Sequence, residues 1–236
     1  MKIRFILIFV ILFFTSCAST ATPEEIQKAT AHYQMGLSYY NGDKPQMAYI
    51  EFQKALELNP YDKKVLNAIG IIHLLNFEDI QTAVGYFGKA IQIDPNFAEA
   101  YNNMGVAYEK AGMLDEAIDY FITASSNPMY QSPEKAYDNL GRAYYRLGLY
   151  DDSIDAYKAA IRRVNNFYPS YYGLALCYNA KGQYGDAATA ITRAVELDPL
   201  YKGNKDKATE DLLNRKIIAK GKEEKDIADY LDILKY

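Results

Sequence analysis

The sequence of 236 residues contains no tryptophan, two cysteines and two histidines. Histidine is the side chain that most often acts as a general base or metal ligand near neutral pH, so such sites have few candidates. Cys17 and Cys177 lie far apart and form no CxxC, zinc-type or disulfide spacing. Glycine-rich phosphate loops and the HExxH and GxSxG motifs are also missing. We therefore expect no enzyme activity, no small-molecule substrate, no metal and no cofactor.

The charge is nearly balanced, with 26 lysine and arginine residues against 30 aspartate and glutamate residues. This mildly acidic balance argues against a nucleic-acid partner, which requires a basic surface. Half of the residues (50%) are apolar and 24% are charged, which is typical of a globular protein. Tyrosine is abundant, at 23 residues, so many side chains combine an apolar ring with a hydroxyl group.

The first residues contain the one long apolar run of the chain. Lys2 and Arg4 precede the apolar stretch from Phe5 to Phe14. This stretch is too short to span a bilayer but suits the core of a signal peptide. We therefore predict that residues 1–16 are a signal peptide that is removed.

Phe14-Thr15-Ser16-Cys17 resembles the lipobox of bacterial lipoproteins, with Phe14 where leucine is usual. The resemblance implies that Cys17 is acylated and starts the mature chain, with residues 17–23 as the lipidated end and a short linker. Ala18 follows the cysteine, which implies sorting to the outer membrane, with the protein on its periplasmic face. Acyl chains such as palmitate would then anchor the protein without a spanning helix. The alternative is an ordinary secretory peptide that is cleaved elsewhere, with Cys17 discarded.

Small residues recur at intervals of 34 to 36 residues through most of the chain. They are Gly36, Gly70, Gly105, Gly141 and Ala175, each followed three residues later by a ring, at Tyr39, His73, Tyr108, Tyr144 and Tyr178. A second series of small residues follows at Ala48, Ala83, Ala117, Ser153 and Ala187. Large residues come four positions after these, at Phe52, Phe87, Phe121, Tyr157 and Ile191, and then Ala55, Ala90, Ala124, Ala160 and Ala194.

These series resemble the tetratricopeptide repeat, in which two antiparallel helices form each unit. Two helices approach closely only where small side chains meet, and large rings fill the gaps beside the crossing. The resemblance implies an all-α fold, a right-handed superhelical solenoid of five helix pairs over residues 24–201. The predicted repeats are 29–62, 63–97, 98–133, 134–167 and 168–201.

Helix ends are marked in the sequence. Asn59, Asp94 and Asp198 each precede a proline, which disfavours the helical conformation of the residue before it, so we expect second helices to end there. Thr22, followed by a proline and by Glu25, forms the pattern of a capping box that opens the first helix.

Residues 202–236 depart from the repeat and are predicted to form two capping helices that cover the last exposed face of the solenoid. Apolar residues at helical spacing are expected on the packed face of each. They are Leu212, Leu213, Ile217 and Ile218 in Lys205–Lys220, and Ile227, Tyr230, Leu231 and Leu234 in Glu223–Lys235.

The reactive residues inside the repeats are interpreted as packing residues. His73 occupies a position that is tyrosine in the other four repeats, and His32 aligns with leucine and tyrosine residues. We expect both rings to be packed, with their nitrogens hydrogen-bonded. Cys177 precedes the core ring Tyr178 and has no histidine in its repeat, so we expect it to be a small packing residue.

In the tetratricopeptide family the first helices line the concave side of the array, and the resemblance assigns specific positions there to partner binding. The candidate residues are Tyr33, Leu37, Tyr40, Asn67, Ile71, Leu74, Asn102, Val106, Arg142 and Tyr145. Equivalent positions with no assigned role are Glu109, Asp138, Tyr172, Leu176 and Asn179. The first half is apolar between asparagines, which suits a protein or peptide segment. The alternative for Leu37, Ile71 and Leu176 is that they pack against each other or against the terminal helices.

One stretch is more specific than the general repeat. Asn127-Pro128-Met129-Tyr130-Gln131-Ser132-Pro133, followed by Ala136, Asn139 and Gly141, resembles the inter-repeat segment of the type IV pilus biogenesis and stability lipoproteins. The resemblance implies an outer-membrane lipoprotein that helps secretin, the pore for the pilus, to reach or assemble in that membrane. The alternative function is a general envelope adaptor that docks cell-wall enzymes or other periplasmic proteins.

Overall fold

The computed structural model describes residues 21–235, and these form twelve α-helices without strands. The repeat helices are α1 (Pro23–Asn41), α2 (Pro45–Leu58), α3 (Lys63–Leu75), α4 (Ile80–Ile93), α5 (Ala98–Lys110), α6 (Leu114–Ser125), α7 (Pro133–Leu147), α8 (Tyr150–Arg163), α9 (Tyr168–Ala180) and α10 (Tyr184–Leu197). Two further helices, α11 (Lys205–Lys216) and α12 (Lys222–Ile233), follow them. The predicted all-α solenoid is confirmed, whereas the residue limits of the individual repeats remain a prediction.

The expected helix signals are present where the sequence placed them. The Thr22 hydroxyl accepts a hydrogen bond from the Glu25 amide (3.2 Å), and the Thr22 amide donates to the Glu25 carboxylate (2.7 Å), so α1 begins with a capping box. Helices α2, α4 and α10 end at the residue before Asn59, Asp94 and Asp198. Gly148 ends α7 with a φ of 78°, a left-handed conformation that glycine adopts without strain.

Each of the first four helix pairs is held together where a ring on the second helix lies against a glycine on the first. A Cβ atom built on Gly105 would lie 2.5 Å from Cε1 of Phe121, far inside van der Waals contact. The same arrangement joins Gly70 to Phe87 and Gly36 to Phe52. All three phenylalanine rings are almost completely buried. The periodic glycines are therefore required by close helix approach.

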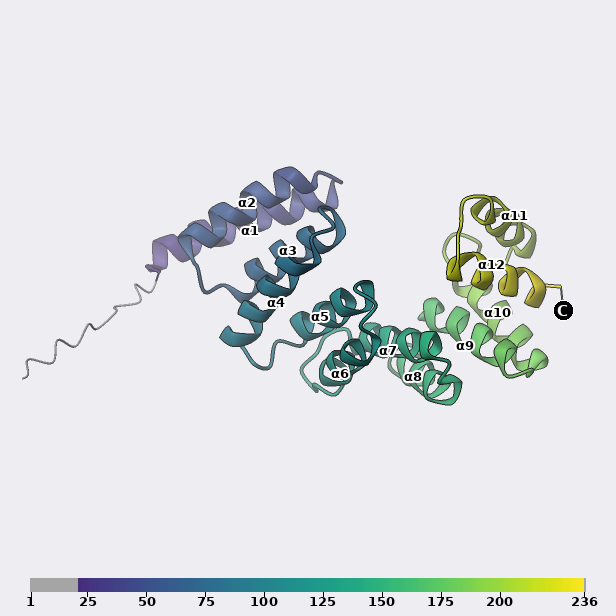
Figure 1. Cartoon of the computed structure of the whole chain (residues 1–236). Helices are drawn as coiled ribbons and strands as arrows, with labels where there is room; N and C mark the ends of the chain where they lie inside the picture. The colour runs from purple at the N-terminus through teal and green to yellow at the C-terminus, as the bar shows by residue number, and fades with distance from the viewer. Residues whose placement is uncertain (1–20, 236) are drawn as a thin grey trace, which may run out of the picture.

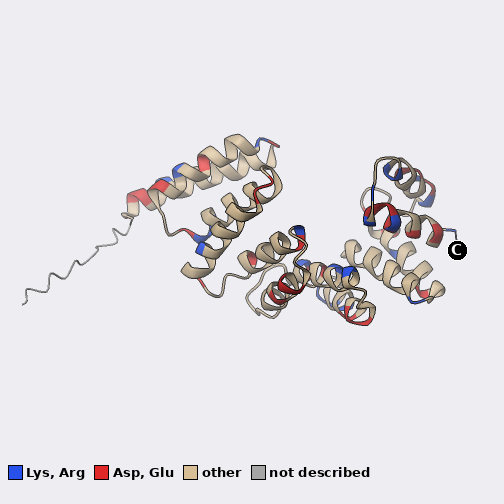
Figure 2. Ribbon diagram, in the orientation of Figure 1, with Lys and Arg blue, Asp and Glu red and all other residues tan. Residues whose placement is uncertain are grey.

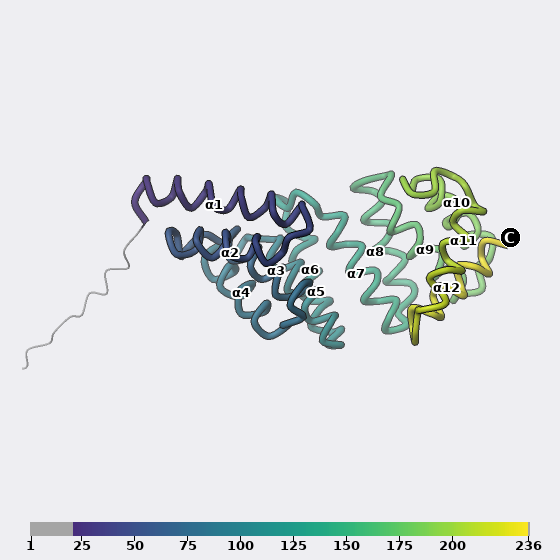
Figure 3. The backbone as a smooth tube through the Cα atoms, turned by 90° about the horizontal axis from the view of Figure 1, so that it is seen from above, coloured from purple at the N-terminus to yellow at the C-terminus, as the bar shows by residue number. Residues whose placement is uncertain are grey.

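The pairs stack into a curved array (Figure 1). The first helices α3, α5, α7 and α9 contact one another in sequence and form the inner, concave layer. The array opens toward the top of the view in Figure 1, with α1–α4 in one arm and α9–α12 in the other. Seen from above, the successive pairs turn relative to one another along the array (Figure 3). No helix within residues 21–235 is long and apolar enough to cross a membrane.

The two terminal helices are present, but they are shorter than predicted and α11 buries less. Ile217 and Ile218 lie beyond the end of α11 and are each 80% exposed, and Leu213 is also exposed, so their predicted packing is wrong. Only Leu212 of that group is buried. In α12, Ile227 and Leu231 are buried as expected.

These helices do not continue the stacking of the repeats. Helix α12 contacts α9 and α10, while α11 contacts α10 and α12. The first helix of a sixth repeat would pack closely against α9, and α11 does not. Ile233, near the end of α12, is 1% exposed and belongs to the same core cluster as Cys177 and Ile191. The end of the chain therefore covers the last repeat from its concave side.

Candidate functional site

The concave side of the first three pairs carries a partly exposed apolar surface, which we call the N-terminal face. It consists of six half-buried candidate residues, Tyr33, Leu37, Tyr40, Asn67, Ile71 and Val106. The apolar members pack at their bases against the core, as Tyr33 does against Phe52 with ring centroids 5.7 Å apart. Burial raises the pKa of Tyr33 and of Tyr40, so both hydroxyls are neutral at pH 7. Such rings can bind an apolar partner while their hydroxyls stay in water.

Three candidate residues are buried, so the expectation that their side chains are exposed is wrong. Leu74 is 3% exposed because Phe87 and Met104 enclose it in one core cluster. Asn102 is buried, and its Oδ1 atom accepts a hydrogen bond from Asn139 (2.9 Å). Whether the candidate residues bind a partner remains a prediction.

Tyr145 is the third buried candidate residue, and helix α12 covers it. Its hydroxyl donates to Asp226 Oδ1 of α12 (3.0 Å), and Lys222 Nζ lies 4.0 Å from the centre of its ring. Burial, together with Asp226, raises the pKa of Tyr145 well above its ordinary value. Repeat alignment missed this contact because it says nothing about where a non-repeating tail packs.

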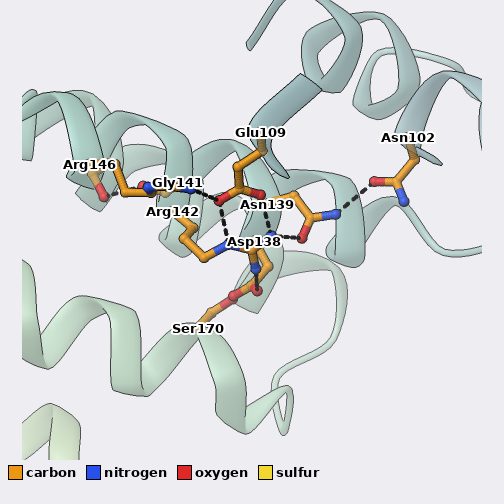
Figure 4. Close-up of polar contacts among 9 residues, drawn as sticks. Asn102, Glu109, Asp138, Asn139, Gly141, Arg142, Arg146 and Ser170 are labelled. Carbon is orange, nitrogen blue, oxygen red and sulfur yellow. Dashed lines mark hydrogen bonds and ion pairs between the residues drawn. The ribbon is translucent and has the colours of Figure 1, made fainter. Parts of the chain in front are cut away.

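A ladder of asparagines links the first helices. Asn103 of α5 donates to Asn67 of α3, and Asn139 of α7 donates to Asn102 of α5, each at 2.9 Å. Arg142 then donates to Asn139 (2.9 Å; Figure 4). Asn103 and Asn139 are not among the concave positions predicted from the sequence. Their shared position, two residues before a crossing glycine, is the signal that could have shown it.

Glu109 forms the strongest charged contact on the concave side. Arg142 binds it through Nε (2.9 Å) and Nη2 (2.7 Å), and Arg146 adds a third contact at 3.2 Å (Figure 4). Burial acts to raise the pKa of Glu109, but the hydrogen bonds and charges of Arg142 and Arg146 outweigh it and lower the pKa overall. Arg142 is therefore already paired within the chain, rather than free for a partner as predicted.

Asp138 lies next to this network on α7. Its carboxylate accepts a hydrogen bond from Ser170 (2.7 Å) and is 3.9 Å from Arg142 Nη1. Burial is the main cause of a raised pKa for Asp138, and Ser170 and Arg142 offset it only in part. Of the neighbouring equivalent positions, Leu176 is buried and the Tyr172 hydroxyl donates to Asp198 (3.3 Å).

A cavity of about 640 Å³ lies at the C-terminal end of the concave side, between α7, α9 and the terminal helices. Acidic and basic residues are frequent in α11 and α12 (Figure 2), and several of them line this cavity. We call this space the C-terminal cavity. The concave side thus divides into an apolar face over α1–α5 and a charged, partly covered cavity over α7–α12.

The histidine and cysteine expectations are confirmed in part. Cys177 is a buried free cysteine whose pKa is raised by burial to about 11, as a packing residue requires. His73 packs among rings and is stacked on Tyr86, but both its ring nitrogens are buried without a hydrogen bond, so the expected partners are absent. His32 Nδ1 lies 2.6 Å from Glu51 Oε2.

No cluster within residues 21–235 could hold a metal ion. The lipidation residue Cys17 lies outside the described residues.

Family models described as tetratricopeptide repeat match residues 29–62, 86–119 and 139–202, together more than half of the chain. The chain belongs to the tetratricopeptide-repeat family.

Curated relatives cover only parts of this tetratricopeptide-repeat protein. The peroxisomal targeting signal receptor of Candida glabrata is 32% identical over 92 residues, which are 39% of this chain and 15% of the receptor. The photosystem I assembly protein Ycf3 of Synechococcus elongatus is 30% identical over 114 residues, or 44% of this chain and 65% of Ycf3. The chain thus spans less than two thirds of the length of either relative.

Solved structures match over a larger share. PilW, described as a widely conserved type IV pilus biogenesis factor, is 22% identical with a TM-score of 0.69, and PilF of Pseudomonas aeruginosa is 18% identical with a TM-score of 0.71. Each alignment covers 88% of this chain and 90% of the other. MamA is 25% identical, with a TM-score of 0.58 over 69% of this chain and 93% of MamA. At these identities the likeness shows a common fold.

Proposed function

We propose that the protein is an outer-membrane lipoprotein that holds a client segment on its N-terminal face and assists type IV pilus biogenesis, through localisation or assembly of the secretin. The likeness to PilW and PilF over about nine-tenths of both chains supports the pilus assignment. The lipobox at Cys17 and the link from Asn127 to Pro133 support it from the sequence.

The observation that carries the proposal is the uncovered N-terminal face. Helix α12 packs on α9 and α10, and α11 packs on α10 and α12. Within residues 21–235 neither helix packs closely on α1, α3 or α5. The rings of Tyr33 and Tyr40 and the side chain of Ile71 therefore stay partly exposed to solvent. Rigid aromatic side chains lose little conformational entropy when they hold a partner, so this face suits an apolar client segment.

Anchoring and binding would act together. Acyl chains on Cys17 would hold the solenoid at the outer membrane, and a client bound on the N-terminal face would be retained there with it. Because one attachment raises the effective concentration for the other, the pair would localise the client more strongly than either alone.

The first test is co-purification of the pilus secretin from detergent-solubilised envelopes. We expect the double variant Tyr33→Ala/Tyr40→Ala to lose the secretin, because aromatic hot spots contribute about 1–4 kcal/mol to binding. Helix content, measured by circular dichroism, should stay unchanged. The matched control is Tyr61→Ala/Tyr184→Ala, which alters two exposed tyrosines that are not on the concave side.

Each outcome separates the parts of the proposal. Full retention of secretin by the Tyr33→Ala/Tyr40→Ala variant rejects the N-terminal face as the binding surface. Absence of secretin with the wild type rejects the pilus assignment. Recovery of cell-wall enzymes in its place supports the general envelope adaptor.

The anchoring part is tested separately by Cys17→Ser. We expect this variant to fold but to fractionate as a soluble protein or an uncleaved precursor. If Cys17→Ser still floats with outer-membrane vesicles, the lipobox interpretation is wrong.

A further inference from the structure

The C-terminal cavity is distinct from the N-terminal face and has the size of a ligand site. Its volume, about 640 Å³, lies within the range of pockets that hold small molecules or single side chains. Helices α7 and α9 form one wall, and α11 and α12 form the other. The cavity exists only because the terminal helices pack back over the concave side.

The repeat pattern is altered at the floor of this cavity. In the first three pairs the ring beneath the crossing glycine is a phenylalanine, whereas in the fourth it is Tyr157. Tyr157 lies between two glycines: a Cβ on Gly141 would be 2.8 Å from its ring, and a Cβ on Gly173 would overlap the ring at Cζ. Gly173 therefore makes room for the hydroxyl end of Tyr157 to pass α9.

The Tyr157 hydroxyl is available to a ligand. Tyr157 is 4% exposed and lines the cavity, yet its hydroxyl forms no hydrogen bond with any residue between 21 and 235. The hydroxyl oxygen of Tyr157 keeps some access to solvent, so it faces the interior of the cavity. Tyr230 of α12 likewise lines the cavity and leaves its hydroxyl without a partner in the described chain. A tyrosine hydroxyl that is open to the cavity and makes no hydrogen bond within the chain can accept one from a bound ligand.

Asp138 supplies negative charge to the same space. It lines the cavity near Tyr157, and the only hydrogen bond it accepts within residues 21–235 comes from Ser170 (2.7 Å). Arg142 Nη1 is 3.9 Å away, but Arg142 is held by two hydrogen bonds to Glu109. Asp138 is thus a desolvated carboxylate whose charge is only partly compensated.

The aromatic walls already hold a cation of this chain. Lys222 Nζ lies 4.0 Å from the centre of the Tyr145 ring, and Tyr172 and Tyr230 continue the wall with ring centroids 5.6 Å apart. Electron-rich ring faces attract ammonium and guanidinium groups, most strongly where water is excluded. Asp226 and Asp198 accept hydrogen bonds from the hydroxyls of Tyr145 and Tyr172. Carboxylates line the cavity in slight excess over basic groups, with Glu109, Asp138, Asp198, Glu223 and Asp226 against Arg142, Arg146, Arg215 and Lys222.

We propose that the C-terminal cavity is a binding site for a cationic group, a guanidinium or ammonium that reaches the Asp138 carboxylate and the Tyr157 and Tyr230 hydroxyls between aromatic walls. The carboxylate and hydroxyl oxygens accept hydrogen bonds from the cation, and the rings contribute cation–π attraction. The cation is carried by a protein side chain or by a free amine, and both present the same chemistry to the site.

The test measures binding of defined probes to the full mature chain by amide chemical shifts. N-acetyl-arginine methylamide and N-acetyl-lysine methylamide represent protein side chains, and putrescine represents free amines. N-acetyl-citrulline methylamide has the shape of the arginine probe without its charge. We expect a cationic probe to bind with a Kd on the order of 1 mM, as suits so small a ligand, and the citrulline probe to bind at least 10-fold more weakly.

Two variants connect binding to the cavity. Tyr157→Phe restores the residue of the first three pairs and should fold normally, with binding weakened about 3- to 10-fold for one lost hydrogen bond. Asp138→Asn removes the carboxylate and should weaken binding by at least about 10-fold. Tyr120→Phe, on α6 and outside the cavity, should bind like the wild type.

The outcomes decide both the chemistry and the source. Binding of the blocked amino acids indicates a protein side chain, and binding of putrescine alone indicates a free amine. The proposal would be overturned if the arginine and citrulline probes bind equally, or if N-acetyl-glutamate methylamide binds more tightly than the cationic probes. It would also be overturned if Asp138→Asn binds with wild-type affinity, or if no cationic probe binds at 20 mM, about 20 times the expected Kd. None of these results depends on the secretin, so this site is tested independently of the proposed function.

Discussion

The N-terminal and C-terminal halves of the array share one packing scheme but have different concave surfaces. In the first three pairs and in the fourth, a ring on the second helix fills the space beside a glycine on the first, as Phe121 does at Gly105 and Tyr157 at Gly141. On the concave side the halves diverge, because the first is apolar and uncovered while the second is charged and covered by α12. A repeat array fixes the contacts between helices and leaves the concave positions free to vary, so one array can carry two unlike sites.

The largest effect should come from overfilling the shared packing. Gly105→Leu places a branched side chain where even a Cβ would lie 2.5 Å from Phe121, so we expect a loss of at least about 3 kcal/mol or failure to fold. The matched control is Gly85→Ala, because no atom lies within 4 Å of a Cβ at Gly85 in α4. That change should stabilise by about 0.5–1 kcal/mol through helix propensity. Equal thermal unfolding of the two variants would contradict the close crossing.

A smaller effect is expected at the boundary between the halves. Glu109→Gln leaves Arg142 and Arg146 without their carboxylate and should lower the free energy of unfolding by about 2 kcal/mol at pH 7. Because the folded-state pKa of Glu109 is below 4.5, this stabilisation is complete above pH 4.5 and is lost as the pH falls through the folded-state value. Urea unfolding at pH 7 and pH 3 should show the gap between wild type and variant narrowing with acid. A gap that stays constant would show that Glu109 is not the titrating group.

The packing of α12 over the concave side of the C-terminal half depends in part on one hydrogen bond. Tyr145→Phe removes the bond to Asp226 and should destabilise α12 by about 1.5 kcal/mol. Hydrogen exchange should then speed up about 10-fold in α12 and remain unchanged in α1–α4. Faster exchange throughout the chain would show that the two halves unfold together.

The smallest expected effect is a gain of stability in the N-terminal half. Both ring nitrogens of His73 are buried without a hydrogen bond, and Nδ1 lies 3.7 Å from Asp79 Oδ2. His73→Phe keeps the ring among Tyr49, Phe77 and Tyr86 and removes the nitrogens that lack hydrogen bonds. We expect the free energy of unfolding to rise by about 1 kcal/mol, measured by urea denaturation. Destabilisation would mean that a histidine nitrogen has a water partner or that its contact with Asp79 is stabilising.

The repeats could be predicted because close packing leaves a periodic trace in the sequence. Gly36, Gly70 and Gly105 are spaced at one repeat length, and each meets the ring that the pattern assigns to it. The capping box at Thr22 could be predicted for a similar reason, since its two hydrogen bonds are local.

The candidate site could be predicted only where the repeat alone determines exposure. Tyr33 and Ile71 are half-buried on the concave side, as their positions require. Tyr145 and Arg142 occupy equivalent positions, but Tyr145 is hydrogen-bonded to Asp226 of α12 and Arg142 to Glu109. The apolar spacing of the tail predicted its helices and the burial of Ile227 and Leu231, but it gave no signal for the contact of α12 with Tyr145, so the C-terminal cavity could not be inferred from the sequence.

The most direct measurement of this division compares client binding in variants of the two halves. Secretin co-purification should be lost in Tyr33→Ala/Tyr40→Ala and retained in Tyr157→Phe, because the client is proposed to lie on the N-terminal face and away from the C-terminal cavity. The reverse result, with secretin retained by the first variant and lost by the second, would contradict the division of the concave side into two independent sites.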